Sequence, residues 1–221
     1  MSKYPNPNLN LLSRLIGSYK NNGTDLSGNG NNLNPTGSVL YGEGINGETD
    51  GASAVDSTNT YQSPSILIPE DSHLSFSVFI RLDNNQVDAA KIDFNTLFAD
   101  GFFSIGLQRL SNTPKNILKF SLPVSTGDTT RIVLELDGSS ENFIHLVITK
   151  DNDSAKVYID GDLYAEVQSV TWGTGLTQFV ISTDAPIETP FFWEYLNIYR
   201  GALSQEEVLA LFNGGDGFQP V

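Results

Sequence analysis

The chain has 221 residues, no cysteine and a formal net charge of -14, from 26 acidic and 12 basic side chains. This balance disfavours binding to nucleic acids and to anionic membrane surfaces, because like charges repel. The lack of cysteine excludes disulfides and thiolate metal sites, and no apolar run is long enough to insert into and span a bilayer.

The N-terminal third combines an apolar stretch with long polar segments. Pro5 and Pro7 bias their neighbours away from helix, so we expect residues 1–10 to form an extended arm, which either docks on a neighbouring subunit or is a loose terminus. An apolar stretch follows that is compatible with a short helix or a strand, made by Leu11, Leu12, Leu15, Ile16 and Tyr19. Residues 20–62 are rich in Asn, Gly, Ser and Thr, which favours loops and short edge strands.

Short strands dominate the rest of the chain, because β-branched and aromatic runs alternate with Gly, Pro, Asn and Asp. In residues 74–82 apolar and polar side chains alternate, except that Phe79 interrupts the polar face, so that face must be covered or line a groove. Further strands are predicted within residues 96–110, 116–122, 131–137, 178–182 and 191–200.

The segment from Phe143 to Val167 carries the strongest strand signal. Residues 143–150 are apolar on both faces, which indicates a central strand covered on both sides. The dipeptide at 160–161, Asp-Gly, is typical of a tight hairpin turn. We therefore expect an antiparallel meander inside a sheet.

One helix is predicted near the C-terminus. Ser204 and Glu207 have the spacing of a capping box, and an apolar stripe follows them. Gly214 and Gly215 are expected to end this helix.

Four segments, in order along the chain, resemble the laminin-G-like, pentraxin-type branch of the concanavalin A-like lectin/glucanase superfamily. They are LIGSYKNNGTDLSGNGNN, LSFSVFIRL, FIHLVITKDNDSAKVYIDGDLYAE and WEYLNIYRGALSQEEVLALFNGG. The resemblance implies an all-β fold, a two-sheet antiparallel β-sandwich (jelly roll) with one short C-terminal helix. We assign residues 11–215 to this domain and residues 216–221 to a C-terminal tail. Members of the family bind glycans, act in protein adhesion, or are passive modules on enzymes or virions.

Sequence patterns argue against an enzyme. Glucanase relatives carry acidic residues at alternate positions on one strand, where two carboxylates can flank a glycosidic bond. Here Glu135 and Asp137 begin that pattern, but Glu141 lies too late and beyond a turn. His73 and His145 lie far apart without a catalytic triad or zinc motif around them, and His145 is expected to be a core side chain.

Calcium is the cofactor that the sequence suggests. Asp25 lies in a loop whose Asn and Gly residues could offer carbonyl oxygens to a cation that needs about six to eight of them. Glu194 stands where relatives have an acidic residue that can join a calcium site, and here Glu replaces the usual Asp. The alternative for Asp25 is a cap of its own loop.

Three aromatic residues are candidates for glycan binding, because the apolar face of a sugar stacks on a flat ring. Trp172 lies next to a glycine in a loop, Trp193 lies within an aromatic strand, and Phe79 could form the floor of a groove. The alternative is that all three pack in the interior.

The expected function is a non-catalytic recognition or structural module. The absence of a signal peptide in MSKYPNPNLN favours a bacteriophage virion protein that decorates a capsid, fibre or tail, contacts phage structural proteins through the N-terminal arm and binds cell-surface glycans. The alternative is an exported carbohydrate-binding or adhesion module of a bacterial surface protein, and a glycoside hydrolase is the third candidate. The expected location is accordingly the virion or the cell exterior.

Overall fold

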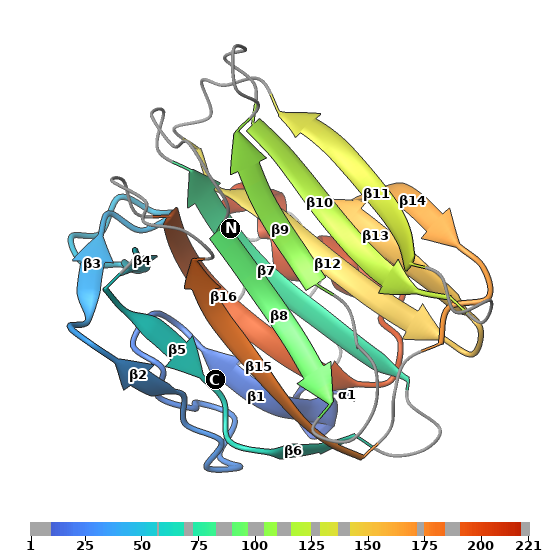
Figure 1. Ribbon diagram of the computed structural model, residues 1–221, viewed down its shortest axis with the longest axis horizontal. Helices are drawn as coiled ribbons and strands as arrows, with labels where there is room; N and C mark the ends of the chain where they lie inside the picture. Colours follow the sequence, from blue (N-terminus) through green and yellow to red (C-terminus); the bar gives the residue numbers. More distant parts are fainter. Residues whose placement is uncertain are drawn as a thin grey trace.

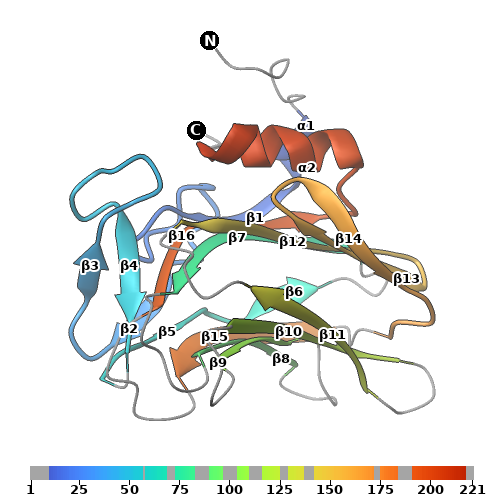
Figure 2. The same ribbon diagram turned by 90° about the horizontal axis from the view of Figure 1, so that it is seen from above.

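The chain forms two antiparallel β-sheets stacked face to face, with helices on the outer face of one sheet (Figures 1 and 2). The computed structural model describes residues 10–56, 58–68, 73–82, 90–96, 104–109, 116–124, 129–136, 142–171, 175–183 and 191–217. The predicted two-sheet antiparallel sandwich with a short C-terminal helix is confirmed. No helix in these ranges is long and apolar enough to cross a membrane.

The sheet under the helices, sheet A, has eight strands in the described ranges. Their order is β14, β13, β12, β7, β16, β4 and β3, and β1 also pairs with β16. The bounds are β1 Leu15–Tyr19, β3 Leu40–Gly42, β4 Ala52–Val55, β7 Leu74–Leu82, β12 Ile144–Asp151, β13 Ser154–Ile159, β14 Asp162–Val167 and β16 Phe191–Arg200. β16 therefore has β7 along one edge, and β4 and then β1 along the other.

The opposite sheet, sheet B, also has eight described strands. Their order is β11, β10, β9, β8, β15, β5 and β2, and β6 also pairs with β15. The bounds are β2 Asn34–Thr36, β5 Thr60–Gln62, β6 Ile66–Ile68, β8 Ala90–Thr96, β9 Ser104–Arg109, β10 Asn116–Pro123, β11 Thr129–Leu136 and β15 Gly175–Thr183. The short strands β2 to β5 lie in the stretch that its Asn, Gly, Ser and Thr content predicted to form loops and short edges.

β12, β13 and β14 form the predicted meander. β12 is buried from Ile144 to Lys150, which confirms that it is a central strand covered on both faces. Asp160 and Gly161 have φ values of 50° and 86°, as a tight primed turn requires.

The main hydrophobic core lies between the sheets, and β16 shows how the chain fills it. Four β16 residues face this core: Phe191, Trp193, Leu196 and Ile198. Their alternation is interrupted by a bulge at Tyr195, which has a φ of 48° and shifts the register with β7 between Glu194 and Asn197. Because of this extra residue, β16 keeps apolar side chains in the core on both sides of the bulge.

Two helices cover the outer face of sheet A: α1 (Asn10–Arg14) and α2 (Gln205–Phe212), the latter followed by a 3₁₀ turn at Asn213–Gly215. A second apolar cluster lies between these helices and the sheet, composed of Leu11, Leu15, Val147, Tyr158, Tyr199, Leu203, Val208 and Leu211. The apolar stretch 11–19, compatible with helix or strand, divides between α1 and β1. Since α1 is a second helix, this part of the chain is more helical than predicted.

The capping box of α2 is present and also fastens α1. The Ser204 Oγ accepts a hydrogen bond from the Glu207 N–H (3.3 Å), and Glu207 Oε2 accepts one from the Ser204 N–H (2.8 Å). The other carboxylate oxygen of Glu207 accepts a hydrogen bond from the Arg14 guanidinium. Helix α2 ends at Asn213, in the left-handed region with φ of 49°, one residue before the predicted glycine pair.

We expect Ser204→Ala to lower the free energy of unfolding by about 1 kcal/mol, because the first turn of α2 loses its cap. Ser204→Asp should stay close to the parent, since Asp accepts the same hydrogen bond. Urea unfolding followed by tryptophan fluorescence measures both variants. An equal loss in the Asp variant would show that the cap is not the cause.

Candidate functional site

Asp25 organises the loop that follows β1. Its Oδ1 accepts hydrogen bonds from the backbone N–H groups of Ser18 (3.0 Å) and Ser27 (2.9 Å), and its Oδ2 accepts one from the N–H of Asn31 (2.8 Å). Asp25 therefore takes the alternative role that the sequence allowed, a cap of its own loop. Both carboxylate oxygens are already engaged by the protein.

β1 carries a bulge at Ile16 that opens backbone carbonyl groups to this loop. The register of β1 on β16 shifts at this residue. The Ile16 carbonyl accepts hydrogen bonds from Nδ2 of Asn29 (3.2 Å) and Nδ2 of Asn31 (2.7 Å), and the Leu15 carbonyl accepts one from Asn29 Nδ2 (2.8 Å). Both amide groups are thereby held in fixed orientations beside β1.

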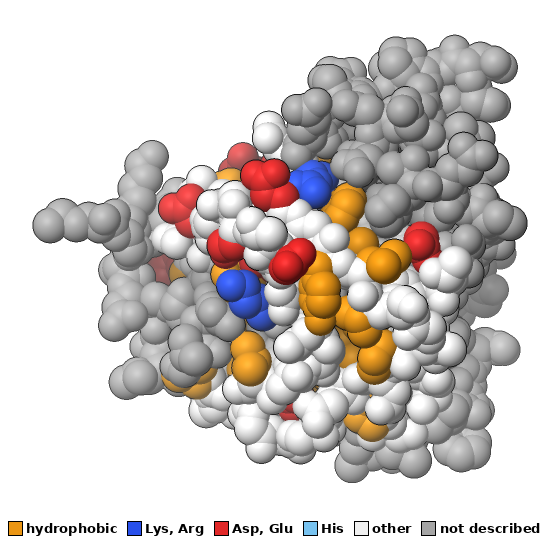
Figure 3. Space-filling view, turned by 90° about the vertical axis from the view of Figure 1, so that its left-hand side faces the viewer, with side chains coloured by type: hydrophobic (Ala, Val, Ile, Leu, Met, Phe, Trp, Pro, Cys, Tyr) orange, Lys and Arg blue, Asp and Glu red, His pale blue; other side chains and the backbone are white. Residues whose placement is uncertain are grey.

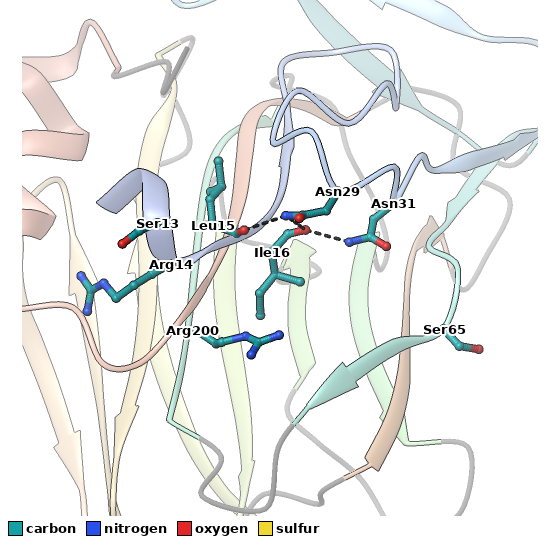
Figure 4. Close-up of a pocket in the computed structure, with 8 residues that line it drawn as sticks. All are labelled: Ser13, Arg14, Leu15, Ile16, Asn29, Asn31, Ser65 and Arg200. Atoms are coloured by element: carbon teal, nitrogen blue, oxygen red, sulfur yellow. Dashed lines mark hydrogen bonds between the residues drawn. The ribbon is translucent and has the colours of Figure 1, made fainter. Parts of the chain in front are cut away.

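A pocket of about 320 Å³ lies where these groups meet the end of β16 (Figure 4). Three parts of the sequence contribute: the N-terminal stretch of α1, β1 and the following loop, the turn before β6, and the last residue of β16. The lining residues are Ser13, Arg14, Leu15, Ile16, Asn29, Asn31, Ser65 and Arg200. We call this the amide pocket. Its lining combines amide, hydroxyl and guanidinium groups with no carboxylate side chain among the described residues.

The two arginines of the amide pocket differ in their surroundings. Arg14 Nη2 donates a hydrogen bond to Glu207, and Arg14 Nη1 donates one to the Ala202 carbonyl (3.2 Å). Figure 4 shows the Arg14 side chain extending away from the asparagines, while that of Arg200 extends beneath Ile16. Arg200 is exposed and forms no ion pair within the described ranges. Its guanidinium is therefore the available positive charge of the pocket.

A second pocket, of about 280 Å³, lies beside the N-terminus of α2. Its lining residues are Thr149, Asp151, Ser154, Lys156, Ala202, Leu203 and Ser204. It contains a lysine and an aspartate close to the capping box, and no asparagine lines it. The two pockets therefore offer different hydrogen-bonding groups and serve as controls for each other.

Glu194 is a buried acidic residue on the outer side of β16. Its exposed fraction is 0%, its Oε2 accepts a hydrogen bond from the Ile45 N–H (2.9 Å), and its Oε1 has no hydrogen-bond partner. Burial and, to a smaller extent, the nearby Glu48 raise the pKa of this carboxyl, against the lowering effects of the Ile45 N–H, Lys20 and the Tyr195 side chain, to a net value of about 7. Glu194 therefore keeps its proton to a higher pH than an exposed carboxyl does.

The loop between β3 and β4, residues 43–51, brings charged groups next to Glu194. Lys20 Nζ lies 3.6 Å from Glu48 Oε1. A Cβ at Gly44 would lie 2.6 Å from Glu48 Oε2 and 2.9 Å from Glu194 Oε2, so the absence of a side chain lets the two carboxylates approach. Figure 3 shows this side of the molecule, where acidic and basic side chains gather in the upper part of the face.

The expected calcium ligands, Asp25 and Glu194, do not share a site with a third acidic residue. Within the described ranges no group of three or more His, Cys, Asp or Glu side chains could hold a metal ion. Asp25 does not suit a cation, because both its oxygens accept backbone N–H groups. Glu194 suits one better, since Glu48 lies near and Oε1 is unpartnered. Calcium binding, expected at Asp25 and Glu194, stays a prediction, and Glu194 is the one of the two whose surroundings favour it.

The structure places two of the three aromatic candidates in the interior. Phe79 is 2% exposed and Trp193 is 0% exposed. Trp193 packs in the main core, where its ring meets that of Tyr61 edge to face at 5.3 Å. Neither ring has a face that a sugar could reach, which corrects their assignment to glycan binding. Trp172 lies outside the described residues.

His145 explains why Phe79 is covered. Its ring stacks on Phe79 (4.4 Å between centroids) and faces Phe212 of α2 (5.9 Å), and its Nε2 is 2.8 Å from the Ser77 Oγ. Burial lowers the pKa of His145 to about 3. The expected core role of His145 is confirmed. Phe79, the aromatic break in the polar face of β7, is thus covered by His145, which in turn faces helix α2.

Of the acidic residues in the incomplete glucanase pattern, only Glu135 lies in the described part of the chain. Glu135 is exposed on β11, an edge strand of sheet B. Asp137 and Glu141 lie outside the described residues. His73 lies far from His145 in the sequence, and its Nε2 accepts a hydrogen bond from the Asn152 N–H (3.2 Å).

Sequence reasoning missed the amide pocket. Asn29 and Asn31 lie in the segment TDLSGNGNN, whose Asn and Gly residues were expected to offer carbonyl oxygens to calcium, and Arg200 lies in YRGAL, part of a family motif. A local signal existed, because Asn-Gly-Asn after an Asx cap predicts a rigid turn with oriented side chains. What the sequence could not supply was the bulge at Ile16 that aligns these groups.

Residues 46–209 match the family model described as the concanavalin A-like lectin/glucanases superfamily. No curated protein matches the sequence.

Several solved structures share the fold. The ligand binding domain of botulinum neurotoxin serotype D in complex with N-acetylneuraminic acid has a TM-score of 0.68 and 16% identity, over 93% of this chain and 52% of that chain. The binding domain of Paraclostridial Mosquitocidal Protein 1 has a TM-score of 0.68 and 18% identity, over 91% and 52%. A botulinum neurotoxin type C structure, described as "Cell entry of botulinum neurotoxin type C is dependent upon interaction with two ganglioside molecules", has a TM-score of 0.68 and 17% identity, over 94% and 53%. This chain spans about half the length of each.

We expect Glu194→Gln to change how stability depends on pH. The folded state holds the Glu194 proton up to a pKa of about 7, whereas the unfolded state releases it near 4.5. The contribution of this group is therefore present below pH 4.5 and is lost as the pH rises through 7. Urea unfolding in EDTA from pH 4 to 8 measures the effect. As the pH rises, the unfolding free energy of the parent should fall relative to that of the variant. A difference that stays constant would contradict the raised pKa.

We expect millimolar calcium to raise the melting temperature of the parent at pH 8, relative to EDTA, because an ionised Glu194 gains a cation. Glu194→Gln should remove this response. Asp25→Ala should lower the melting temperature by the same amount with and without calcium, since it loses only the loop cap. Differential scanning fluorimetry measures all three, and identical parent melts in calcium and EDTA would contradict a calcium site.

Proposed function

Because the chain belongs to the concanavalin A-like lectin/glucanases superfamily, we propose that it is a non-catalytic module that recognises glycans, and that the amide pocket holds the sugar. The observation that carries this proposal is the pocket lining. Asn29 and Asn31 are held by β1, and each presents its Oδ1 without a partner in the described residues. Fixed acceptors of this kind match the hydroxyl groups of a sugar.

The absence of acidic side chains from the pocket lining supports binding rather than hydrolysis. Glycoside hydrolysis ordinarily needs two carboxylates on either side of the bond that breaks. The described residues that line the amide pocket include none, and Glu207, which contacts Arg14, is occupied by the capping box. The proposed module therefore binds its sugar without cleaving it.

The structural relatives support the choice of ligand class. One was solved with N-acetylneuraminic acid, and the type C neurotoxin structure is described in terms of two ganglioside molecules. These ligands are known for those proteins, and the shared fold makes a glycan the first class to test here.

The location on a bacteriophage particle, with the arm over residues 1–10 as its attachment, stays a prediction beside the alternative of an exported adhesion module. Copurification with assembled particles distinguishes the two.

A glycan array with the labelled protein tests the function. We expect binding to a subset of glycans and no release of reducing sugar from them. Titration of the ¹⁵N-labelled protein with a bound glycan should then shift backbone amide signals of residues 13–16, 29–31, 65 and 200. Failure to bind any glycan would overturn the function. Shifts confined to residues 149–156 and 202–204 would move the site to the second pocket.

A further inference from the structure

The side chain of Arg200 ends in a positive charge without a protein counter-ion, in a chain of net charge -14. It is exposed, it lines the amide pocket and it forms no ion pair in the described ranges. Arg14, the other arginine of the pocket, is neutralised by Glu207. The pocket therefore offers one free guanidinium, a group that binds carboxylates through two parallel hydrogen bonds.

The backbone on either side of Arg200 is fixed. Arg200 pairs with Leu74 at the end of β16, and the following Gly201 has a φ of 84° and donates its N–H to the His73 carbonyl (2.6 Å). The next element, α2, is capped and packed on sheet A. The position from which the guanidinium extends is thus set by the fold before any ligand arrives, which lowers the entropy cost of binding.

The neutral groups of the pocket identify the kind of anion. Asn29 Nδ2 donates to the Leu15 and Ile16 carbonyls and Asn31 Nδ2 donates to the Ile16 carbonyl, which leaves the Oδ1 of each side chain and one N–H of Asn31 for a ligand. The two oxygen acceptors attract hydroxyl hydrogens and repel an anion without them, such as sulfate. A ligand that carries both a carboxylate and hydroxyl groups satisfies the guanidinium and the amide oxygens together.

The volume of the pocket limits the size of the ligand. About 320 Å³ is at the lower end of the range of roughly 300–1,000 Å³ for small-molecule sites. It suits one sugar residue and leaves the rest of a glycan in solvent.

We propose that the amide pocket binds a single acidic sugar residue, with Arg200 holding its carboxylate and the Oδ1 atoms of Asn29 and Asn31 accepting hydrogen bonds from its hydroxyl groups. This rests on the proposed glycan-binding function and names the ligand class for the same site. Arg200 is then the specificity-determining residue, because it distinguishes an acidic sugar from a neutral one.

The test combines a change in the protein with a change in the ligand. The ligands are methyl glycosides of N-acetylneuraminic acid and of glucuronic acid, the methyl esters of both, and methyl galactoside as a neutral sugar. The proteins are the parent, Arg200→Gln, Arg200→Lys and Lys156→Gln. Lys156→Gln removes the same charge from the second pocket and is the matched control. Melting temperatures verify that each variant is folded, and calorimetry measures the dissociation constants.

We expect the parent to bind at least one of the two acidic sugars about tenfold or more tightly than its methyl ester, because a charge-assisted pair is lost in the ester. Arg200→Gln should lose a similar factor for the acid and nothing for the ester. Arg200→Lys should fall between, since it keeps the charge without the paired hydrogen bonds. Lys156→Gln should match the parent. Whichever of the two acidic sugars binds shows whether the pocket takes N-acetylneuraminic acid or glucuronic acid.

Three results would overturn this assignment and leave glycan binding intact. They are equal affinity of the parent for acid and ester, an unchanged affinity of Arg200→Gln for the acid, and preferential binding of methyl galactoside. If the parent binds none of these sugars and no glycan on the array, both the assignment and the proposed function fail.

Discussion

From Phe191 to Tyr199, strand β16 is buried on both faces, and this burial constrains everything around it. Sheet B covers one face, and the helices and the loop over residues 43–51 cover the other. Both edges are also paired, with β7 on one side and β4 and β1 on the other. A strand enclosed in this way must supply large apolar side chains to both sides, and each fully buried one stabilises the fold by about 1.5–3 kcal/mol. The aromatic sequence FFWEYLNIY meets that demand.

The same enclosure explains why irregular backbone appears where it does. β4 and β1 share one edge of β16, and the bulge at Tyr195 lies between their pairing regions. A second bulge, at Ile16, releases carbonyl groups that the asparagines of the following loop then bind. Bulges commonly re-aim side chains and end pairing near functional sites. Here the bulge at Ile16 borders a pocket with oriented polar groups.

The features that the sequence predicts best are those that depend on neighbouring residues. The capping box of Ser204 and Glu207 and the Asp160-Gly161 turn are local, and both have the expected geometry. The burial of Phe79 and Trp193 depends on which elements cover each sheet, and this cannot be read from strand alternation alone.

The candidate site is harder still to predict from the sequence. The amide pocket joins residues 13–31 to Ser65 and Arg200, which are distant in the chain, so no sequence spacing contains it. The loop cap by Asp25, by contrast, was one of the two roles that the sequence allowed, because it depends on neighbouring residues.

Two buried ionisable groups on the outer side of sheet A respond to acid in opposite senses. As the pH falls from about 7 to 4.5, the contribution of Glu194 grows. Below pH 6.5 the contribution of His145 declines, because its pKa in the folded chain is about 3 and the unfolded chain takes up the proton first. Over the range in which both act, the two slopes oppose each other. The imidazole that faces Phe212 of α2 therefore stays uncharged at pH values where an exposed histidine is protonated.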